Sequence, residues 1–273
     1  MTITCNLMGG LGNQLFQIFA TMAHAIYTNQ PVVFLRQEQL GTRFTAWNTL
    51  LKGLQPILVS TLPSDMLVVR EPEFPYNRLP YIPSKNISFF GYFQSEKYFK
   101  PCYQHIYNMC GIGLRRDELK ERLPAYEFSM TTVSLHFRIG DYKKVQHYHP
   151  IMTLEYYANA LAHIRGKVAG PLKVVYFCED VDLVDVLVVV NKLQPKFPEY
   201  TFVRCIDGLA DWEQMLYMSF CSHNIIANST FSWWGAYFNP NTEKVVCYPS
   251  VWFGPAANSD VRDLCPSEWV RLE

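Results

Sequence analysis

Residues able to bind an anion follow an apolar run in the second half of the chain, in the string HFRIGDY at positions 136–142. In an extended strand, His136 and Arg138 point to the same face. A guanidinium at a strand end can hold a phosphate through two parallel hydrogen bonds, and Asp141 could orient it or accept a substrate hydroxyl. The plainer interpretation is an Arg138–Asp141 ion pair that closes the strand. We favour anion binding, because Arg-x-Gly-Asp at a strand end is an uncommon combination.

A second string, CEDVD at positions 178–182, also follows an apolar run. Asp180 could contact the amino edge of a purine or a ribose hydroxyl. Together with Asp182, it has the spacing with which metal-dependent sugar transferases hold a divalent ion, and carboxylate oxygens suit Mg²⁺ or Mn²⁺. For Asp182 we favour the plainer interpretation, a cap on the following helix.

A third string, NSTFSWWG at positions 228–235, has Ser229 or Thr230 as the N-cap of a short helix. The start of a helix presents backbone N–H groups, so this turn could be a second phosphate site opposite Arg138. The plainer interpretation is a capped helix with Trp233 and Trp234 in the core. The two interpretations are compatible.

A glycine cluster near the N-terminus, MGGLGN at positions 8–13, connects an apolar run to a helical pattern. Glycines at such a junction let backbone N–H groups approach a ligand closely. The dinucleotide fingerprint fits only in part, because Leu15 stands where the third glycine is required. A tight turn without a ligand and an anion or sugar site therefore suit the loop about equally well.

The elements that must position these strings alternate between strand and helix. The first part predicts a strand at 3–7, a helix at 14–28 and a strand at 32–35, whereas prolines interrupt residues 40–100, in which 89–93 is the clearest strand. The later part predicts helices at 114–123, 153–167, 182–193 and 230–238, one more from Asp211, and strands at 132–137, 172–178, 200–204, 224–227 and 244–248. Thr153 and Gln214 fit the start of two of these helices. This alternation predicts an α/β protein with parallel sheets, whose ligands bind beyond the carboxyl ends of the strands.

Length and composition narrow the class of protein. The 273 residues allow two domains, and the proline at 124 suggests a boundary that gives residues 1–127 and 128–273. Lys plus Arg balances Asp plus Glu at 24 each, so neither a nucleic acid nor an anionic membrane is expected as partner. The eight cysteines form no C-x-x-C pair, and no signal peptide or membrane span is expected, which together suggest a cytoplasmic protein.

In this order along the chain, GGLGNQLFQ at 9–17, HFRIGDY at 136–142 and NSTFSWWGAYF at 228–238 resemble the α-1,2-fucosyltransferases of glycosyltransferase family 11. GYFQSEKYF at 91–99 and TLEYY at 153–157 also match that pattern. The resemblance implies two facing Rossmann-like domains of the GT-B type, with the acceptor on the N-terminal domain and the GDP-sugar on the C-terminal one. It implies inverting transfer of L-fucose from GDP-fucose to the 2-hydroxyl of a terminal galactose, with no metal and no cofactor. It also suggests a prokaryotic or viral enzyme, because this chain starts directly with a strand.

The resemblance also assigns roles to single residues. It places Arg138 on the pyrophosphate, His136 and Asp180 on the nucleoside, and Ser229, Thr230 and Phe231 on the phosphates. Gly10, Gly12 and Asn13 would approach the donor from the N-terminal domain. Inversion calls for a base near the attacking hydroxyl, with Asp141 as first candidate and His149 as second. For His147 and His149 we expect an exposed loop, and Ile139 stands where many relatives carry a second arginine.

Other functions fit parts of the pattern. One is a transferase that uses GDP-mannose or a metal held by Asp180 and Asp182, which a chelator would reveal. Another is an NAD-dependent oxidoreductase, with Glu38 as a ribose contact, although the missing third glycine counts against it. A third is a sugar-binding protein without activity. Acceptor specificity is expected from residues 40–100 and 146–150, and the sequence predicts no oligomeric state.

Overall fold

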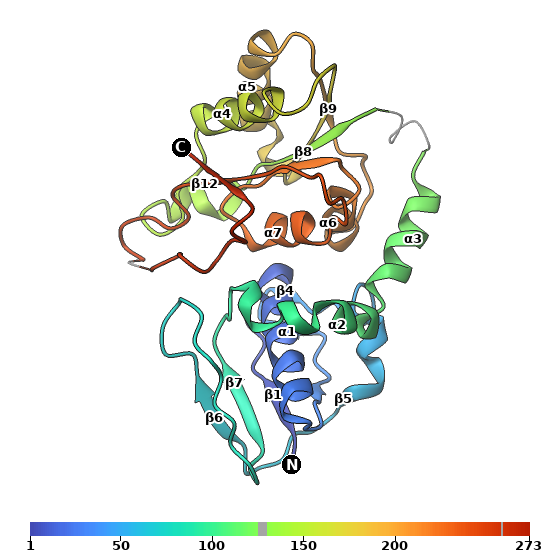
Figure 1. The fold of residues 1–273 in the computed structure, drawn as a ribbon, viewed down its shortest axis with the longest axis vertical. Coiled ribbons are helices and arrows are strands. Elements are labelled where there is room, and N and C mark those ends of the chain that lie inside the picture. The colour runs from blue at the N-terminus through green and yellow to red at the C-terminus, as the bar shows by residue number, and fades with distance from the viewer. Residues whose placement is uncertain (125–129, 258) are drawn as a thin grey trace. The chain divides into compact units, whose positions relative to one another are not determined.

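The computed structural model describes residues 1–124, 130–257 and 259–273. The chain divides into two compact units, Met1–Glu118 with Asp260–Pro266, and Leu119–Ser259 with Ser267–Glu273 (Figure 1). The boundary predicted between residues 127 and 128 lies outside the described residues and stays a prediction. Both units are α/β with parallel sheets, which confirms the predicted fold class.

The first unit is built on a three-stranded parallel sheet in the order β1 (Ile3–Cys5), β7 (Ile87–Phe90) and β6 (Leu67–Arg70). Beside β1, a bridge from Ile3 to Val32 leads into the parallel pair of β2 (Phe34–Leu35) and β5 (Leu58–Val59). The remaining elements are the antiparallel hairpin of β3 (Gln39–Leu40) and β4 (Arg43–Phe44), the 3₁₀ turns Lys52–Ile57, Glu96–Tyr98 and Lys100–Cys102, and helix α2 (Tyr103–Cys110). Helix α3 (Ile112–Arg122) begins in this unit and ends in the second one.

Helix α1 (Leu11–Thr28) packs on this sheet. Its buried face includes Leu15, Phe16 and Phe19, and the Phe19 ring meets Phe99 edge-on at 5.4 Å. Each such fully buried side chain stabilises the fold by about 1.5–3 kcal/mol. The helix begins three residues earlier than predicted, because Gly10 in extended conformation already serves as its N-cap.

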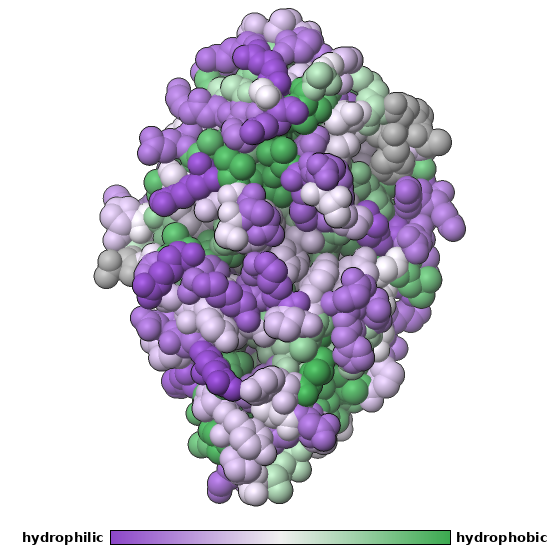
Figure 2. Space-filling model, in the orientation of Figure 1, coloured by the Kyte–Doolittle hydropathy of each residue, from purple (hydrophilic) through white to green (hydrophobic). Residues whose placement is uncertain are grey.

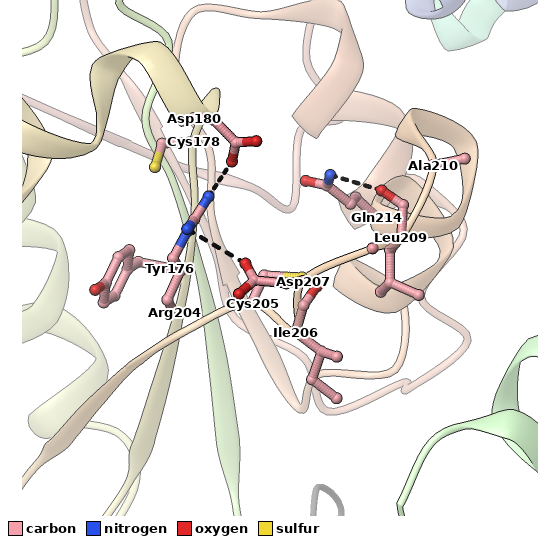
Figure 3. A pocket seen from close by; sticks show the side chains of 11 residues that line it. Tyr176, Cys178, Asp180, Arg204, Cys205, Ile206, Asp207, Leu209, Ala210 and Gln214 are labelled. Carbon is pink, nitrogen blue, oxygen red and sulfur yellow. Dashed lines mark hydrogen bonds and ion pairs between the residues drawn. The ribbon is translucent and has the colours of Figure 1, made fainter.

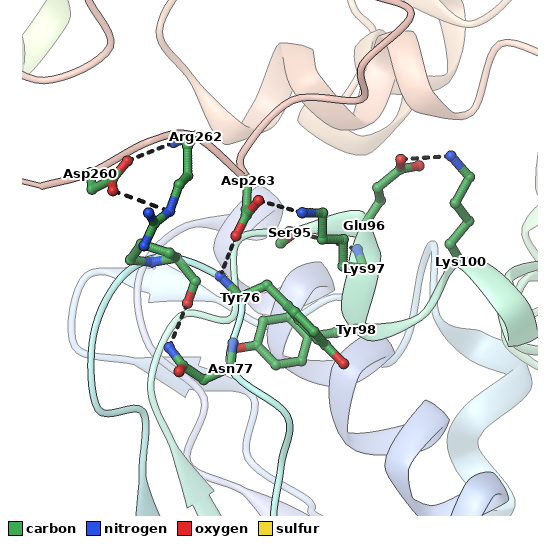
Figure 4. Close-up of polar contacts among 11 residues, drawn as sticks. Tyr76, Asn77, Ser95, Glu96, Lys97, Tyr98, Lys100, Asp260, Arg262 and Asp263 are labelled. Atoms are coloured by element: carbon green, nitrogen blue, oxygen red, sulfur yellow. Dashed lines mark hydrogen bonds and ion pairs between the residues drawn. The ribbon is translucent and has the colours of Figure 1, made fainter.

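Residues 260–266 return from the C-terminal part of the chain to the first unit, as Figure 4 shows. The Asp263 carboxylate accepts a hydrogen bond from the Tyr76 amide at 3.1 Å and pairs with Lys97. Tyr98 stacks edge-on against Tyr76, and its hydroxyl accepts from the Asn77 amide at 3.2 Å. One carboxylate thus fixes both the proline-rich segment and the loop after β7.

The second unit holds a six-stranded parallel sheet. Its order is β10 (Thr201–Arg204), β9 (Lys173–Phe177), β8 (Thr132–His136), β11 (His223–Ile225), β12 (Val246–Pro249) and β13 (Val270–Leu272). Its helices are α4 (Leu154–Arg165), α5 (Leu183–Leu193), α6 (Asp211–Met218) and α7 (Thr230–Tyr237), with 3₁₀ turns at Gly140–Lys144, Asp180–Asp182 and Gln194–Lys196. Figure 1 shows α4 and α5 on one side of the sheet and α6 and α7 on the other.

If the six strands are numbered 1 to 6 from β8 to β13 along the chain, their order across the sheet is 3-2-1-4-5-6, which is that of a doubly wound nucleotide-binding fold. The winding reverses between β8 and β11, so the loops after these two strands leave a crevice at the carboxyl edge of the sheet. The core beneath them is apolar: Val133, Leu135, Leu161, Val174 and Val186 are fully buried. On the face drawn in Figure 2, hydrophilic side chains predominate and apolar ones stand in smaller groups.

Several local predictions were wrong in detail. The strand predicted at 89–93 ends at Phe90, because the chain turns and Phe93 takes a left-handed conformation with φ of 53°. Strand β13 was not predicted. Helix α6 does begin at Asp211, but Ala210 is its N-cap, and Glu213 rather than Gln214 accepts the Ala210 amide at 2.8 Å. Thr153 caps α4 as predicted, because its side chain accepts from the Tyr156 amide at 3.2 Å.

Candidate active site

Two predicted strings lie on either side of the reversal in strand order. Arg138 is the second residue after β8, and Ser229 is the fourth after β11. The two strands are direct neighbours, with His223, Asn224 and Ile225 in register with residues 133–135. The fold therefore brings together two segments that are about 90 residues apart in the sequence, at the position where doubly wound sheets bind ligands.

The Arg138 guanidinium is held from several sides. It forms ion pairs with Asp141 and with Glu179, the second residue after β9. It also lies over the Tyr142 ring, at 5.0 Å from the centroid, and the Tyr142 hydroxyl donates to the Asn228 carbonyl at 3.1 Å. Its side chain is 18% exposed, whereas both carboxylates are about half exposed. The Arg138–Asp141 ion pair of the plainer interpretation is therefore present, and the Arg138 guanidinium remains partly accessible to solvent.

The turn that carries Asp141 is fixed by a carboxylate from the next loop. The Asp182 side chain is buried, accepts from the Gly140 amide at 2.6 Å and pairs with Lys143 at 3.2 Å. Asp182 occupies the N-cap position of α5, as predicted, but its side chain makes no capping hydrogen bond to that helix. Ile139 packs into the apolar core, so its side chain lies away from the Arg138 guanidinium.

His136 is buried at the end of β8. Its Nδ1 lies 2.9 Å from the Ser232 hydroxyl, which itself donates to the Ser229 carbonyl at 3.3 Å. The hydroxyl oxygen therefore accepts from Nδ1, and Nε2 is left as the acceptor nitrogen. Burial lowers the pKa of His136 to about 3, and the positive charge of Arg138 adds to this effect. The ring is thus neutral near pH 7 and acts as a hydrogen-bonding group rather than a proton carrier.

The start of α7 is capped by Ser229, whose side chain accepts from the Phe231 amide at 3.3 Å. This confirms the predicted N-cap. Trp233 and Trp234 are fully buried, as predicted, and they anchor the helix in the core. The Phe231 ring lies 5.6 Å from the His136 ring, so the first turn of α7 touches the end of β8. A helix N-terminus so placed favours an anion.

A pocket of about 520 Å³ lies beyond the ends of β9 and β10 (Figure 3). Asp180 pairs there with Arg204, which also holds Asp207 at 3.2 Å. The Asp180 side chain is 90% exposed. Asp180 and Asp182 have different partners, and the described residues contain no group of three or more potential metal ligands.

His149, the second base candidate, is half-buried, so the expectation of an exposed loop is wrong for it, although His147 is exposed. Its ring stacks on Tyr142 at 4.8 Å, and its Nδ1 has no hydrogen-bond partner among the described residues. Burial lowers the pKa of His149; the nearby Asp141 charge raises it by a smaller amount, and the Arg138 charge lowers it further. The imidazole is therefore uncharged at neutral pH and can accept a proton.

The glycine loop belongs to the first unit and is clamped by amide side chains of α1. Gln17 exchanges hydrogen bonds with the amide and carbonyl of Met8, at 2.8 and 3.2 Å, and Gln14 donates to the Gly9 carbonyl at 3.0 Å. Gly9 has φ of 74°, and a Cβ there would lie 2.5 Å from the Asn13 side chain. At Gly10 a Cβ would meet nothing within 4 Å, and Gly12 lies in the first turn of α1. The position that requires glycine is therefore Gly9, which sequence reasoning did not single out.

Sequence reasoning also missed four side chains that complete the site. Glu179 and Tyr142 contact Arg138, Ser232 contacts His136, and Arg204 holds Asp180. Glu179 directly precedes Asp180 after a predicted strand, so its position was a usable signal. Arg204 had a similar signal as the last residue of β10, whereas the partners of Ser232 and Tyr142 depend on strand order.

Comparison with known proteins identifies the family. The model of glycosyl transferase family 11 matches residues 69–273. The chain belongs to that family. Among curated relatives, it is 34% identical over 146 residues to the Escherichia coli O-antigen biosynthesis glycosyltransferase WbnK, over 52% of this chain and 44% of that protein. It is 28% identical over 194 residues to an Escherichia coli alpha-1,2-colitosyltransferase, over 69% of this chain and 63% of that protein. The matches thus span less than two thirds of either relative.

Solved structures agree on the fold. A mutant of Arabidopsis thaliana FUT1 in complex with GDP superposes with a TM-score of 0.51, at 9% identity, over 97% of this chain and 74% of that one. A glycosyl transferase family 9 protein from Veillonella parvula also reaches 0.51, at 13% identity, over 100% of this chain and 86% of that one. These likenesses support the predicted GT-B-like class. Within the described ranges, no helix combines the length and apolar character needed to cross a membrane.

Proposed function

We propose that this family 11 protein transfers L-fucose from GDP-fucose to the 2-hydroxyl of a terminal galactose, with inversion and without a metal. The proposal depends on the placement of Arg138 and the start of α7 on either side of the strand-order reversal. A leaving diphosphate develops negative charge. A guanidinium and a helix N-terminus supply the positive field that a metal ion otherwise provides.

In this proposal the nucleoside extends from Arg138 into the pocket beyond β9 and β10. Asp180 lies on the wall of that pocket, and a carboxylate can accept hydrogen bonds from the N–H groups of guanine. Neutral His136 offers Nε2 as a further acceptor. The α7 turn with Ser229, Thr230 and Phe231 receives the phosphates, and the loop with Gly10, Gly12 and Asn13 serves the donor from the first unit.

The names of similar proteins support a GDP-linked donor more strongly than they support fucose as the transferred sugar. The Arabidopsis thaliana structure holds GDP, and the name of one curated relative includes a 1,2 linkage and a colitosyl group. Colitosyl transfer is therefore the second candidate function for this site. Fucose is preferred because the three motifs resemble α-1,2-fucosyltransferases.

In the transfer step, the acceptor oxygen forms a bond to the anomeric carbon, and the bond from that carbon to the phosphate oxygen breaks. The electron pair of the broken bond leaves with GDP, and the hydroxyl proton goes to a base. Asp141 is the first candidate base. A diphosphate that takes over Arg138 would release the Asp141 carboxylate from its ion pair, so that it can face the acceptor hydroxyl.

His149 is the second candidate base, and pH profiles distinguish the two. If His149 is the base, His149→Gln removes most of the turnover and the acid limb of kcat/KM disappears. That limb lies below the ordinary histidine pKa, because burial lowers the pKa of His149. If Asp141 is the base, Asp141→Asn abolishes transfer at every pH while GDP binding remains, and His149→Gln leaves the profile in place.

The first test is a transfer assay with GDP-fucose and lactose, with and without EDTA, in which mass and linkage analysis identify the product. A 1,2-linked product of inverted configuration that survives EDTA supports the proposal. Product that is lost on chelation moves the chemistry to Asp180 and Asp182. If GDP-fucose is inert while GDP-mannose or a nucleotide-activated colitose reacts, the donor assignment is wrong and the site assignment stands.

A further inference from the structure

Two exposed aromatic side chains lie in loops that follow strands of the first unit. Phe44, on the hairpin after β2, is 72% exposed, and Tyr92, directly after β7, is 40% exposed. Residues 93–96 and Gly91 are buried, so Tyr92 is the one outward side chain of that turn. Because β2 and β7 belong to the parallel strands of this unit, both loops leave from carboxyl ends, where such sheets bind ligands.

Tyr92 is held by a fixed backbone. The Glu71 carboxylate accepts from the Tyr92 amide at 2.7 Å and from the Phe93 amide at 3.0 Å. Gly91 lies directly against this carboxylate, since a Cβ there would be 2.4 Å from Glu71 Cβ. Phe93 takes a left-handed conformation, with φ of 53°, which costs on the order of 1 kcal/mol for a non-glycine residue. Strain of this kind persists where the surroundings determine one geometry, so Tyr92 is presented in a defined position.

Phe44 is attached to the glycine loop. The Gln14 side chain donates to the Phe44 carbonyl at 3.1 Å and to the Gly9 carbonyl at 3.0 Å. On the other side of the loop, Asn13 packs against Gly9 and accepts from the Gln94 side chain at 3.1 Å. Hydrogen bonds and packing thus lead from the Phe44 hairpin through the glycine loop to the turn that carries Tyr92. We name residues 8–10, 44 and 92 the glycine-loop rim.

The rim has the chemistry of a carbohydrate site. A pyranose presents an apolar C–H face that packs on an aromatic ring, and hydroxyls at its edge that need polar partners. Amide side chains can both donate to and accept from hydroxyls. In the part of the chain that the structure describes, the Oε1 atoms of Gln14 and Gln94 are buried beneath the rim and have no hydrogen-bond partner.

We propose that Phe44 and Tyr92 are the stacking positions for pyranose rings of the glycan acceptor. The inference deepens the proposed function and depends on it for the reaction. Both residues belong to the first unit, and in this proposal they determine how tightly an acceptor binds. The glycine loop then has a structural task, which is to hold the two aromatic positions in register.

The test uses the full chain with Phe44→Ala, Tyr92→Ala and the control Tyr27→Ala. Tyr27 is 69% exposed and lies near the far end of α1, away from the carboxyl edge of the sheet. With saturating GDP-fucose and varied lactose, each rim variant should raise the acceptor KM about 2- to 12-fold, as expected for one aromatic contact. The affinity for GDP should stay unchanged, and Tyr92→Trp should retain acceptor binding. Tyr27→Ala should behave as the unsubstituted chain.

A second measurement separates this proposal from the proposed function. Saturation-transfer NMR with lactose and GDP detects acceptor binding without turnover. If no sugar is transferred but lactose binds and the rim variants weaken it, the rim proposal stands and the donor assignment fails. Lactose binding that both rim variants leave unchanged, or that Tyr27→Ala weakens equally, overturns the rim proposal. So does the absence of binding by lactose and by larger galactose-terminated oligosaccharides to the unsubstituted chain.

Discussion

Replacement of Arg138 gives the most direct test of the anion site. In the structure this guanidinium contacts two carboxylates, Asp141 and Glu179, which are about half exposed. Release of both costs little, because exposed ion pairs contribute at most about 1 kcal/mol each. Two hydrogen bonds to a diphosphate would contribute about 3–6 kcal/mol. Subtracting about 2 kcal/mol for the two ion pairs leaves about 1–4 kcal/mol, so Arg138→Ala should weaken GDP binding roughly 5- to 700-fold.

The assay is isothermal titration with GDP, accompanied by thermal unfolding. Arg138→Lys should give an intermediate loss, because it keeps the charge and loses the planar fork. The free energy of unfolding should change by only about 1 kcal/mol in either variant, since the partner carboxylates remain solvated.

Arg165→Ala is the matched control. The Arg165 guanidinium lies over the Phe197 ring, 5.0 Å from its centroid, and pairs with Glu199 at 3.6 Å, so its surroundings resemble those of Arg138. It stands at the end of α4, however, and not at a strand end. GDP affinity within threefold of the unsubstituted value in Arg138→Ala, or an equal loss in Arg165→Ala, would refute the reasoning.

Two further predictions concern the first unit. Gly9→Ala should lower the free energy of unfolding by about 1–3 kcal/mol in urea denaturation, because of its positive φ and the contact with Asn13, whereas Gly10→Ala should change it little; equal effects would contradict the assignment. Burial lowers the pKa of His24 to about 4, so between that value and its ordinary pKa the unfolded chain binds a proton that the folded chain does not. The free energy of unfolding should therefore fall by at most about 3 kcal/mol as pH drops from 7 to 4, and His24→Gln should lose that part of the dependence; an unchanged slope would place the titrating group elsewhere.

Local pattern was enough to predict much of the second unit. Alternating strand and helix signals predicted the parallel sheet, and Ser229 and Thr153 were identified as N-caps from their own neighbourhoods. Arg138 and Asp180 were selected because ligands of such sheets meet the residues that follow strands. These inferences hold because periodicity, capping and turn chemistry depend on residues only a few positions apart.

Contacts between distant segments required the tertiary structure. Strand order decides that β8 lies between β9 and β11, and only this order brings Glu179 to Arg138 and Ser232 to His136. The same holds for Asp182, which is the N-cap residue of α5 as predicted but whose side chain fixes the Gly140 turn.

By itself, then, the sequence determined the fold class, the segments that end in chemical groups and the family motifs. The tertiary structure decided which of those groups meet, that position 9 of the glycine loop has no room for a side chain, and that residues 260–266 return to the first unit. The physical reason is one of range. Backbone preferences act within a turn, whereas the pairing of charges and the packing of strands follow from burial of apolar surface across the whole chain.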